Sequence, residues 1–186
     1  LRWSDHSERI LPTREEYEIL MNNVGTHSRI CPTGSVRDIF FENSYGLLEV
    51  ESRVTDWIPM DNTEDYYASR DKGTTTRIHD AVRYALKYVD GQIIDDDGNN
   101  YDETENIVID FDLFDEDQDG YIDAITLIHS GYAAETGGTD SYGRFWEDRI
   151  WSHKWELFTQ PFRSRKGRNV SVNSYHISSG LWGLSG

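Results

Sequence analysis

The chain has 186 residues, with 34 Asp and Glu against 18 Lys and Arg, which gives a formal net charge of −16 at pH 7. It is 37% hydrophobic and 13% aromatic, so it can bury a core and is too rich in Trp, Tyr and Phe for a disordered acidic tail. We therefore expect residues 1–186 to form one soluble domain or part of one.

The excess negative charge is confined to one segment. From Tyr88 to Gly143 the chain has 16 acidic residues and no Lys or Arg, whereas the rest is balanced. A field of this sign repels phosphate backbones and anionic lipids and attracts divalent cations. The sequence also lacks an apolar run of membrane-spanning length. We therefore predict no nucleic-acid partner and no membrane span.

Cys31 is the only cysteine, so the chain can form neither an internal disulfide nor a cysteine-based zinc site. This cysteine is either buried or paired outside the chain. The chain begins at Leu1 without an initiator Met and ends at Gly186 without an obvious terminating element, and we expect it to be part of a longer protein. Asn169-Val170-Ser171 fits the N-glycosylation pattern, which favours a secreted protein with a glycan on Asn169.

Short local patterns predict the first elements. Thr13 and Glu16 form a capping-box pattern ahead of a helix over about residues 14–22. Ser35 caps a second short helix. Apolar and polar residues alternate from 48 to 55, which is typical of a half-buried strand.

The strongest helix signal covers residues 76–89, where one apolar stripe contains Ile78, Ala81, Val82, Ala85, Leu86 and Val89. Asp97-Gly98 predicts a hairpin turn after it. Apolar patterns then predict strands over residues 122–128, 150–155 and 170–177, with a loop at Gly131 and Gly137-Gly138. The predicted fold class is mixed α and β, with helices packed on a sheet.

The sharpest local motif is the acidic loop from Asp115 to Asp123, with carboxylates at loop positions 1, 3, 5 and 9 and glycine at position 6. Calcium loops need this spacing because alternate side chains converge on one point and the glycine permits a sharp turn. The alternative is an acidic turn without an ion, but carboxylates so close together would repel one another. The predicted calcium ligands are Asp115, Asp117, Asp119, Asp123 and the backbone carbonyl of Tyr121.

This loop differs from an EF-hand. Position 12 is Thr126 instead of a bidentate glutamate, and the segment leads into a predicted strand. We therefore expect a structural calcium site without EF-hand architecture.

No other motif selects a catalytic residue. The six histidines are at least 21 residues apart, so the chain cannot form a helical zinc pair. We expect His129, His153 and His176 to be hydrogen-bonded structural residues. The sequence lacks the glycine-rich signatures of serine hydrolases and nucleotide-binding enzymes, which weakens both of those interpretations.

Five short motifs follow one another in a distinctive order. They are Pro32-Thr33-Gly34-Ser35-Val36-Arg37-Asp38, Phe41-Glu42-Asn43-Ser44-Tyr45-Gly46, the Asp115 to Asp123 loop, Ile128-His129-Ser130-Gly131-Tyr132 with Glu135 and Gly137-Gly138, and Ile150-Trp151-Ser152-His153-Lys154-Trp155. In this order they resemble the immune inhibitor A family of secreted zinc metallopeptidases. The resemblance spans nearly the whole chain.

This resemblance implies a zincin-like metallopeptidase domain, with a twisted mixed sheet and flanking helices, stabilised by calcium and active on polypeptides. In that family a His-Glu-x-x-His helix supplies two zinc ligands and the general base, and it follows soon after the strand that corresponds to residues 170–177. This chain ends at Gly186, before such a helix. We therefore expect it to be the N-terminal, calcium-bearing part of the domain, with the remainder of the domain as its partner and no catalytic residue of its own.

Two other functions stay open. A relative without the zinc helix could serve as an inactive structural or adhesive module in an extracellular assembly. The aromatic residues and the acidic loop are also compatible with a calcium-dependent carbohydrate-binding module, because aromatic rings can stack on ligands. Zinc binding and cleavage of casein would argue against the first alternative.

Overall fold

The computed structural model describes residues 1–93, 108–158 and 160–184. The chain divides into two compact units, Pro12–Trp57 and a larger unit made of Leu1–Leu11 with Ile58–Gly186. The predicted hairpin turn at Asp97-Gly98 lies outside the described residues.

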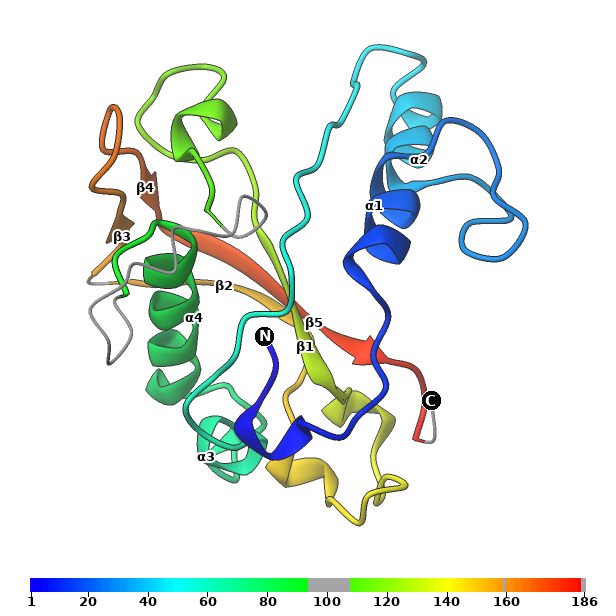
Figure 1. Cartoon of the computed structure of the whole chain (residues 1–186), viewed down its shortest axis with the longest axis vertical. Helices are drawn as coiled ribbons and strands as arrows, with labels where there is room; N and C mark the ends of the chain where they lie inside the picture. Colours follow the sequence, from blue (N-terminus) through cyan, green and yellow to red (C-terminus); the bar gives the residue numbers. More distant parts are fainter. Residues whose placement is uncertain (94–107, 159, 185–186) are drawn as a thin grey trace. The chain divides into compact units, whose positions relative to one another are not determined.

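The smaller unit is built around two short helices, α1 (Arg14–Asn22) and α2 (Val36–Asn43) (Figure 1). Each begins with a complete capping box, in which the side chain of the N-cap residue and that of the third helical residue exchange hydrogen bonds with each other's backbone amides. The N-cap residues are Thr13 and Ser35. Both predicted helices are therefore confirmed.

The predicted strand over residues 48–55 is wrong, because this segment is extended but pairs with no strand among the described residues. Its backbone groups bond instead to side chains of α1. The Ser52 amide donates to Asn22 Oδ1 at 2.8 Å, and Asn22 Nδ2 donates to the Ser52 carbonyl at 2.8 Å. The Val54 amide donates to Glu18 Oε1 at 3.2 Å. Alternation therefore marked an extended chain, whereas a ladder also requires a neighbouring strand.

The larger unit contains a three-stranded sheet in the order β1-β5-β2. β1 (Thr126–Tyr132) runs parallel to β5 (Ser174–Leu181), and β2 (His153–Glu156) pairs antiparallel with the other side of β5 (Figure 1). A second, two-stranded sheet pairs β3 (Phe162–Arg163) with β4 (Ser171–Val172). The mixed α and β class predicted from the sequence is confirmed.

The first residues of the chain lie along the remaining side of β1. The Leu1 amine donates to the Ile128 carbonyl at 2.5 Å, and the Ser130 amide donates to the Leu1 carbonyl at 2.9 Å. On the other side of this N-terminal segment, the Arg2 amide donates to the Ile58 carbonyl and the Met60 amide donates to the Arg2 carbonyl. The segment therefore extends the sheet by hydrogen bonds typical of a strand.

The strand boundaries differ from those predicted. The apolar run at 122–128 is strand only from Thr126, and β1 continues through Gly131, which was expected in a loop. The strand predicted over residues 150–155 starts only at His153. The strand predicted over residues 170–177 is interrupted at Asn173, between β4 and β5. Ile122 and Ile125 pack against the core from outside the strand, because apolar character reports burial and not strand pairing.

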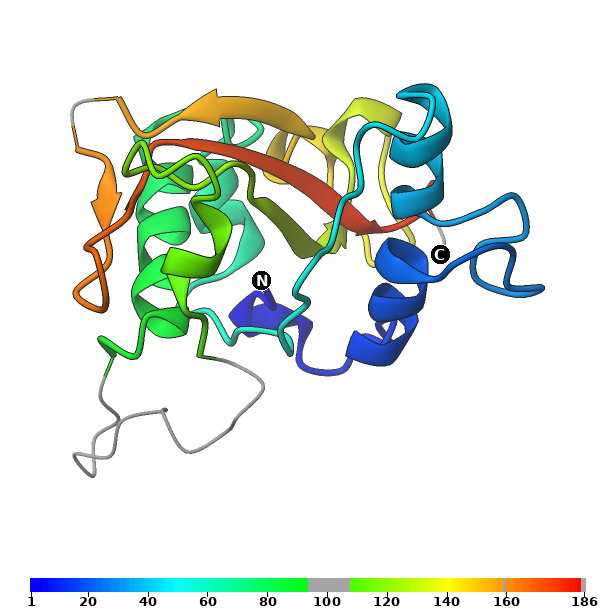
Figure 2. The ribbon, with the colours of Figure 1, turned by 90° about the horizontal axis from the view of Figure 1, so that it is seen from above.

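Helix α4 (Thr76–Val89) covers one face of the three-stranded sheet (Figure 2). Its length and its apolar stripe were both predicted, and all six predicted stripe residues are buried. A five-residue helix, α3 (Glu64–Ala68), precedes it and was not predicted from the sequence. Short 3₁₀ turns complete the described elements: η1 (Ser4–His6), η3 (Phe111–Phe114), η4 (Ala134–Thr136) and η5 (Trp146–Asp148).

A buried carboxylate ties the end of α4 to the two-stranded sheet. Asp90, the C-cap residue of α4, accepts a hydrogen bond from Ser164 Oγ at 2.5 Å and from the Arg165 amide at 3.0 Å. Both bonds reach about 75 residues along the chain. The β3–β4 hairpin, residues 162–172, is thereby fixed beside α4.

Candidate functional site

The acidic loop is a tight turn between η3 and β1. The Asp123 amide donates to the Phe114 carbonyl at 2.7 Å, which closes the loop at its base. Gly120 has φ of +90°, a conformation that favours glycine, and Gln118 is also left-handed at +61°. The glycine at position 6 is therefore required by the backbone, as the calcium-loop pattern predicts.

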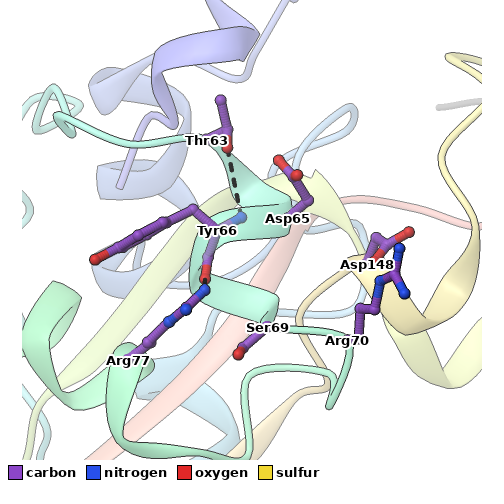
Figure 3. Close-up of a pocket in the computed structure, with 7 residues that line it drawn as sticks. All are labelled: Thr63, Asp65, Tyr66, Ser69, Arg70, Arg77 and Asp148. Atoms are coloured by element: carbon purple, nitrogen blue, oxygen red, sulfur yellow. Dashed lines mark hydrogen bonds between the residues drawn. The ribbon is translucent and has the colours of Figure 1, made fainter.

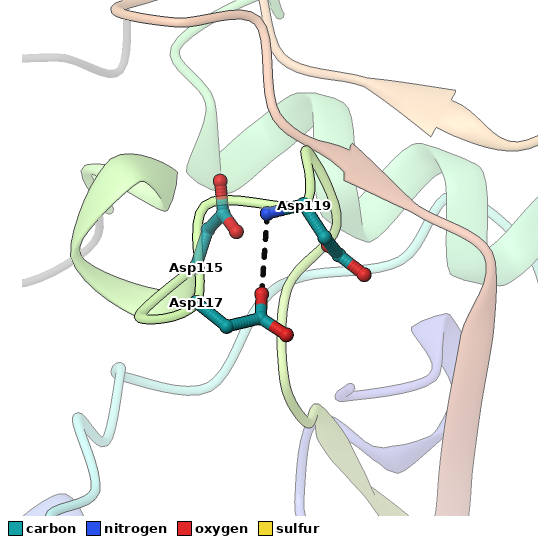
Figure 4. A group of neighbouring side chains, drawn as sticks. All are labelled: Asp115, Asp117 and Asp119. Carbon is teal, nitrogen blue, oxygen red and sulfur yellow. Dashed lines mark hydrogen bonds between the residues drawn. The ribbon is translucent and has the colours of Figure 1, made fainter.

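Three of the predicted ligands converge in this turn. Asp115, Asp117 and Asp119 each offer a carboxylate oxygen within 4.8 Å of the other two, and Figure 4 shows them around one side of the loop. Asp117 accepts from the Asp119 amide at 3.1 Å, and Asp119 accepts from the Tyr121 amide at 2.8 Å. These bonds hold Asp117 and Asp119 in place through the backbone of the loop itself.

The other two predicted ligands, Asp123 and Tyr121, each have a backbone partner of their own. The carboxylate of Asp123 accepts a hydrogen bond from the Glu116 amide at 3.3 Å and lies outside the group of three. Tyr121 forms a backbone bridge with Ser171 of β4. The structure thus brings together positions 1, 3 and 5 of the loop, whereas position 9 has a backbone partner of its own.

The β3–β4 hairpin supplies a cation to the same loop. Arg168 Nη2 donates to the carbonyl oxygens of Asp112 and Asp115 at 2.9 and 3.2 Å, and it lies 3.4 Å from Asp115 Oδ2. The Arg168 amide also donates to the Asp112 carboxylate at 2.9 Å. Asp115 is almost fully buried, so this guanidinium offsets part of the cost of burying its charge.

Asn169 lies at the tip of the same hairpin. It is exposed, with φ of +60°, and its amide donates to the Lys166 carbonyl at 3.1 Å. Ser171, the third residue of the glycosylation pattern, is buried in β4. The side chain that would carry a glycan is therefore accessible in the folded chain.

A second group of polar residues, which the sequence analysis did not identify as a group, lies at the end of β1. His6, Glu64 and His129 are all buried. The Glu64 carboxyl group lies within 4 Å of a ring nitrogen of each histidine. The available signal was the Ile128-His129-Ser130-Gly131-Tyr132 motif, because a histidine, a serine and a glycine interrupt an apolar run there. Their partners, His6 and Glu64, are distant in the sequence, so the sequence did not indicate the contact.

The aromatic residues around β2 form a partly exposed surface. Trp155 and Phe158 meet edge to face at 5.9 Å, and both are more than a third exposed. His153 Nδ1 donates to the Trp151 carbonyl at 2.7 Å, so Nε2 accepts from the Tyr175 hydroxyl at 3.2 Å. Burial lowers the pKa of His153 and raises that of Tyr175, which keeps both groups neutral at pH 7.

The histidine predictions are partly confirmed by these contacts. His153 is hydrogen-bonded as expected, and so is His129, whose Nδ1 accepts from the Gly131 amide at 3.2 Å. His176 is exposed on the opposite face of β5. Cys31 is buried and free.

A hollow of about 560 Å³ lies between α3 and the start of α4. Figure 3 shows that Arg77 crosses it toward Tyr66, where its Nη1 donates to the carbonyl oxygen at 3.2 Å. The lining is charge-balanced and consists of Thr63, Asp65, Tyr66, Ser69, Arg70, Arg77 and Asp148. Because this lining is balanced in charge and lacks a histidine or cysteine, the hollow does not indicate a particular reaction.

Comparison with known proteins decides the family. Residues 14–181 match the model of the immune inhibitor A peptidase M6 catalytic domain. The chain belongs to this family of metallopeptidases. It is also 30% identical over 132 residues to immune inhibitor A of Bacillus thuringiensis subsp. alesti, an alignment that covers 68% of the chain and 18% of that protein. The chain thus spans about a fifth of the length of the curated relative that it matches.

A metallopeptidase family implies a metal ion, typically zinc. In the part of the chain that the structure describes, the potential metal ligands that converge are the carboxylates of Asp115, Asp117 and Asp119. Zinc in proteins is bound mainly by imidazole and thiolate, whereas carboxylates alone suit a hard cation such as calcium. The described residues therefore do not fit a catalytic zinc centre.

None of the described helices is long and apolar enough to cross a bilayer.

The backbone of the acidic loop provides a test of its geometry. We expect Gly120→Ala to destabilise the chain by about 1–2 kcal/mol, because an L-residue is strained at this φ although no atom lies near its Cβ. Gln118→Gly should have the opposite effect, with a net gain of about 0.5–1 kcal/mol, because relief of the left-handed strain exceeds the entropy cost of glycine. Urea unfolding of both variants measures the two changes. Equal stability of the two variants would contradict the loop geometry.

Proposed function

We propose that this chain is part of the catalytic domain of a secreted zinc endopeptidase, in which it contributes the sheet, a calcium-stabilised loop and one wall of the substrate cleft. The observation that supports the proposal is the match of residues 14–181 to the catalytic domain of the M6 family. The zinc ligands and the general base would then lie outside this chain. Zinc would supply Lewis-acid activation of a water molecule.

Secretion and a glycan on Asn169 belong to the same proposal. The exposed position of Asn169 on the hairpin supports the glycan.

The proposal is tested by proteolysis with the longer protein that contains this chain. We expect that protein to cleave casein, to lose this activity with 1,10-phenanthroline and to regain it with zinc. The isolated 186-residue chain should cleave nothing under the same conditions. A longer protein that binds no zinc and leaves casein intact would overturn the proposal in favour of an inactive structural module.

Strand β2 is the part of this chain that is best suited to bind an extended polypeptide. It lies at the edge of the three-stranded sheet, and no strand among the described residues pairs with its outer side. The Leu157 amide bonds to the Asn173 carbonyl at 2.7 Å, so the alternation of an antiparallel ladder directs the backbone of Lys154 and Glu156 outward. A shallow hollow beside Lys154, Trp155, Glu156 and Ser174 accompanies this edge. Extended peptides commonly bind by adding a strand to such an edge.

Lys154→Pro tests this edge, because proline removes the outward N–H and is tolerated at the edge of a sheet. A lost hydrogen bond of about 1 kcal/mol should lower kcat/KM for casein peptides about fivefold in the longer protein. Lys154→Ala is the matched control, because it keeps the amide and should retain activity. Equal losses in the two variants, or no loss in either, would place the substrate elsewhere.

The acidic loop is the calcium site in this proposal. Asp115, Asp117 and Asp119 would contribute carboxylate oxygens, and Tyr121 would contribute its carbonyl. Asp123 would contribute through its second oxygen or through a water molecule, because Oδ2 accepts from the Glu116 amide. The convergence of the first three carboxylates within 4.8 Å supports this assignment.

Calcium should stabilise the chain by mass action if it binds only the folded loop. At a hundredfold excess over Kd the gain is about 2.7 kcal/mol, so the melting temperature should rise with calcium and fall with a chelator. Asp117→Ala combined with Asp119→Ala should remove this response. The control changes Glu116 and Gln118 to Ala at the even loop positions and should keep it. A melt of the unmodified chain that is unaffected by chelation would contradict the assignment.

A further inference from the structure

A fully buried carboxyl group lies where three separate segments meet in the larger unit. Glu64, the first residue of α3, is 0% exposed, as is His129 of β1, and His6 of η1 is 1% exposed. Glu64 Oε2 is 3.4 Å from His6 Nε2, and Glu64 Oε1 is 3.7 Å from His129 Nδ1. We refer to Glu64, His6 and His129 as the Glu64 cluster. It is independent of the acidic loop and of the proposed peptidase activity.

The carboxyl position is fixed by the backbone of β1. A Cβ atom built on Gly131 would lie 2.1 Å from Glu64 Oε1, so only glycine leaves room for the carboxyl group at this point. This contact explains why the strand contains a glycine within the His-Ser-Gly motif. The carboxyl group therefore packs directly against the backbone of β1 at Gly131.

Several charged groups lie next to the cluster. Arg144 Nε is 3.2 Å from Glu64 Oε2, and the same guanidinium pairs with Asp5 and Asp65. Arg9 Nη1 donates to the Ser130 carbonyl at 3.1 Å. The charged and titratable groups that face His6 and Glu64 are Asp5 from η1, Arg9 from the segment after it, Asp65 from α3, and Asp140 and Arg144 from the loop between η4 and η5. His129 is also faced by the amine of Leu1 and by His153 of β2.

The protonation of His6 follows from its partners. His6 Nδ1 lies 3.0 Å from the Ser130 carbonyl oxygen and 2.9 Å from Ser130 Oγ. A carbonyl oxygen can only accept, so Nδ1 carries a hydrogen. The ring nitrogen that faces Glu64 is Nε2, and among the described residues neither this nitrogen nor either oxygen of Glu64 forms a hydrogen bond. Their other neighbours are ion-pair contacts: Asp5 Oδ1 lies 3.7 Å from Nε2, and Arg144 Nε lies 3.2 Å from Oε2.

A lone pair on Nε2 would therefore face a carboxylate oxygen at 3.4 Å in a site without water access. Two acceptors in such a position repel each other unless a proton lies between them. We propose that His6 and Glu64 share a single proton, and that this proton is a pH-sensitive lock that holds η1 and the loop around Arg144 against the end of β1.

The environment of the two groups supports this state. Burial raises the pKa of Glu64 to about 8, and burial lowers the pKa of His6 to about 3. Burial also lowers the pKa of His129 well below its usual value. At pH 7 the pair thus holds one proton on the carboxyl side, and both rings are neutral.

The sign of the pH effect follows from proton linkage. Glu64 keeps its proton in the folded chain up to about pH 8, whereas an unfolded glutamate loses it near pH 4.5. The stability that Glu64 contributes is therefore complete below pH 4.5 and is lost as the pH rises to 8. His6 has the opposite sign, with its contribution complete above pH 6.5 and lost toward pH 3.

Glu64→Gln separates the shared proton from every other titration in the chain. Glutamine has the same shape, and its amide donates permanently to Nε2 without titrating. We expect the unfolding constant of the unmodified full chain to rise about tenfold per pH unit relative to Glu64→Gln between about pH 5 and 8. The matched control is Asp65→Asn, which faces the same Arg144 from an exposed position and should run parallel to the unmodified chain. Parallel curves for Glu64→Gln and the unmodified chain would overturn the proposal.

Two measurements on the unmodified chain do not depend on how Glu64→Gln folds. The ring ¹⁵N shifts of His6 should show a hydrogen on Nδ1 from pH 5 to 8, and a neutral ring with its hydrogen on Nε2 alone would overturn the shared proton. The amides of Asp140 and Arg144, which bond within their loop, should lose at least tenfold of their exchange protection between pH 6 and 9 after correction for intrinsic rates. Retained protection at pH 9 would overturn the lock.

Discussion

The buried carboxyl group of Glu64 is the constraint on which the arrangement at the end of β1 depends. A carboxyl group without solvent is costly unless its hydrogen-bonding and charge requirements are met, and here they must be met by η1, β1 and the loop of Arg144 together. In the sequence, η1 lies more than 100 residues before both β1 and the loop of Arg144. Because no single segment can satisfy the group, all of them must be in place at once, and Gly131 is the residue that leaves the necessary space.

The acidic segment presents the same physical problem at a more exposed place. Asp115 is buried and contacts Arg168 of the β3–β4 hairpin, whereas Asp117 and Asp119 are exposed and accept from backbone amides of the loop. The hairpin thus compensates one carboxylate, and the others retain oxygens that can face a cation. This division of roles gives the proposed calcium site a structural connection to α4, because the same hairpin is anchored by Asp90.

Predictions from the sequence succeeded where the determining interactions are local. Helices α1, α2 and α4 were predicted from capping residues and from apolar spacing, both of which act within a few residues. Strand predictions were less accurate for the opposite reason. The alternation at residues 48–55 produced no ladder among the described residues, since Ser52 and Val54 bond to side chains of α1. Gly131 was expected in a loop but lies in β1, where a distant glutamate occupies the space that a side chain would need.

The sequence by itself determined the mixed α and β class, the family resemblance and the glycine at position 6 of the acidic loop, because each is encoded by residues close together or by motifs in a fixed order. Only the tertiary structure decided that β2 is the edge strand, that Arg168 reaches Asp115, and that His6 meets Glu64. These contacts join segments far apart in the chain, and their energies depend on burial and on distances that spacing along the sequence does not specify. The physical reason is that desolvation, which controls the cost of a buried charge, is a property of the folded environment and not of the residue.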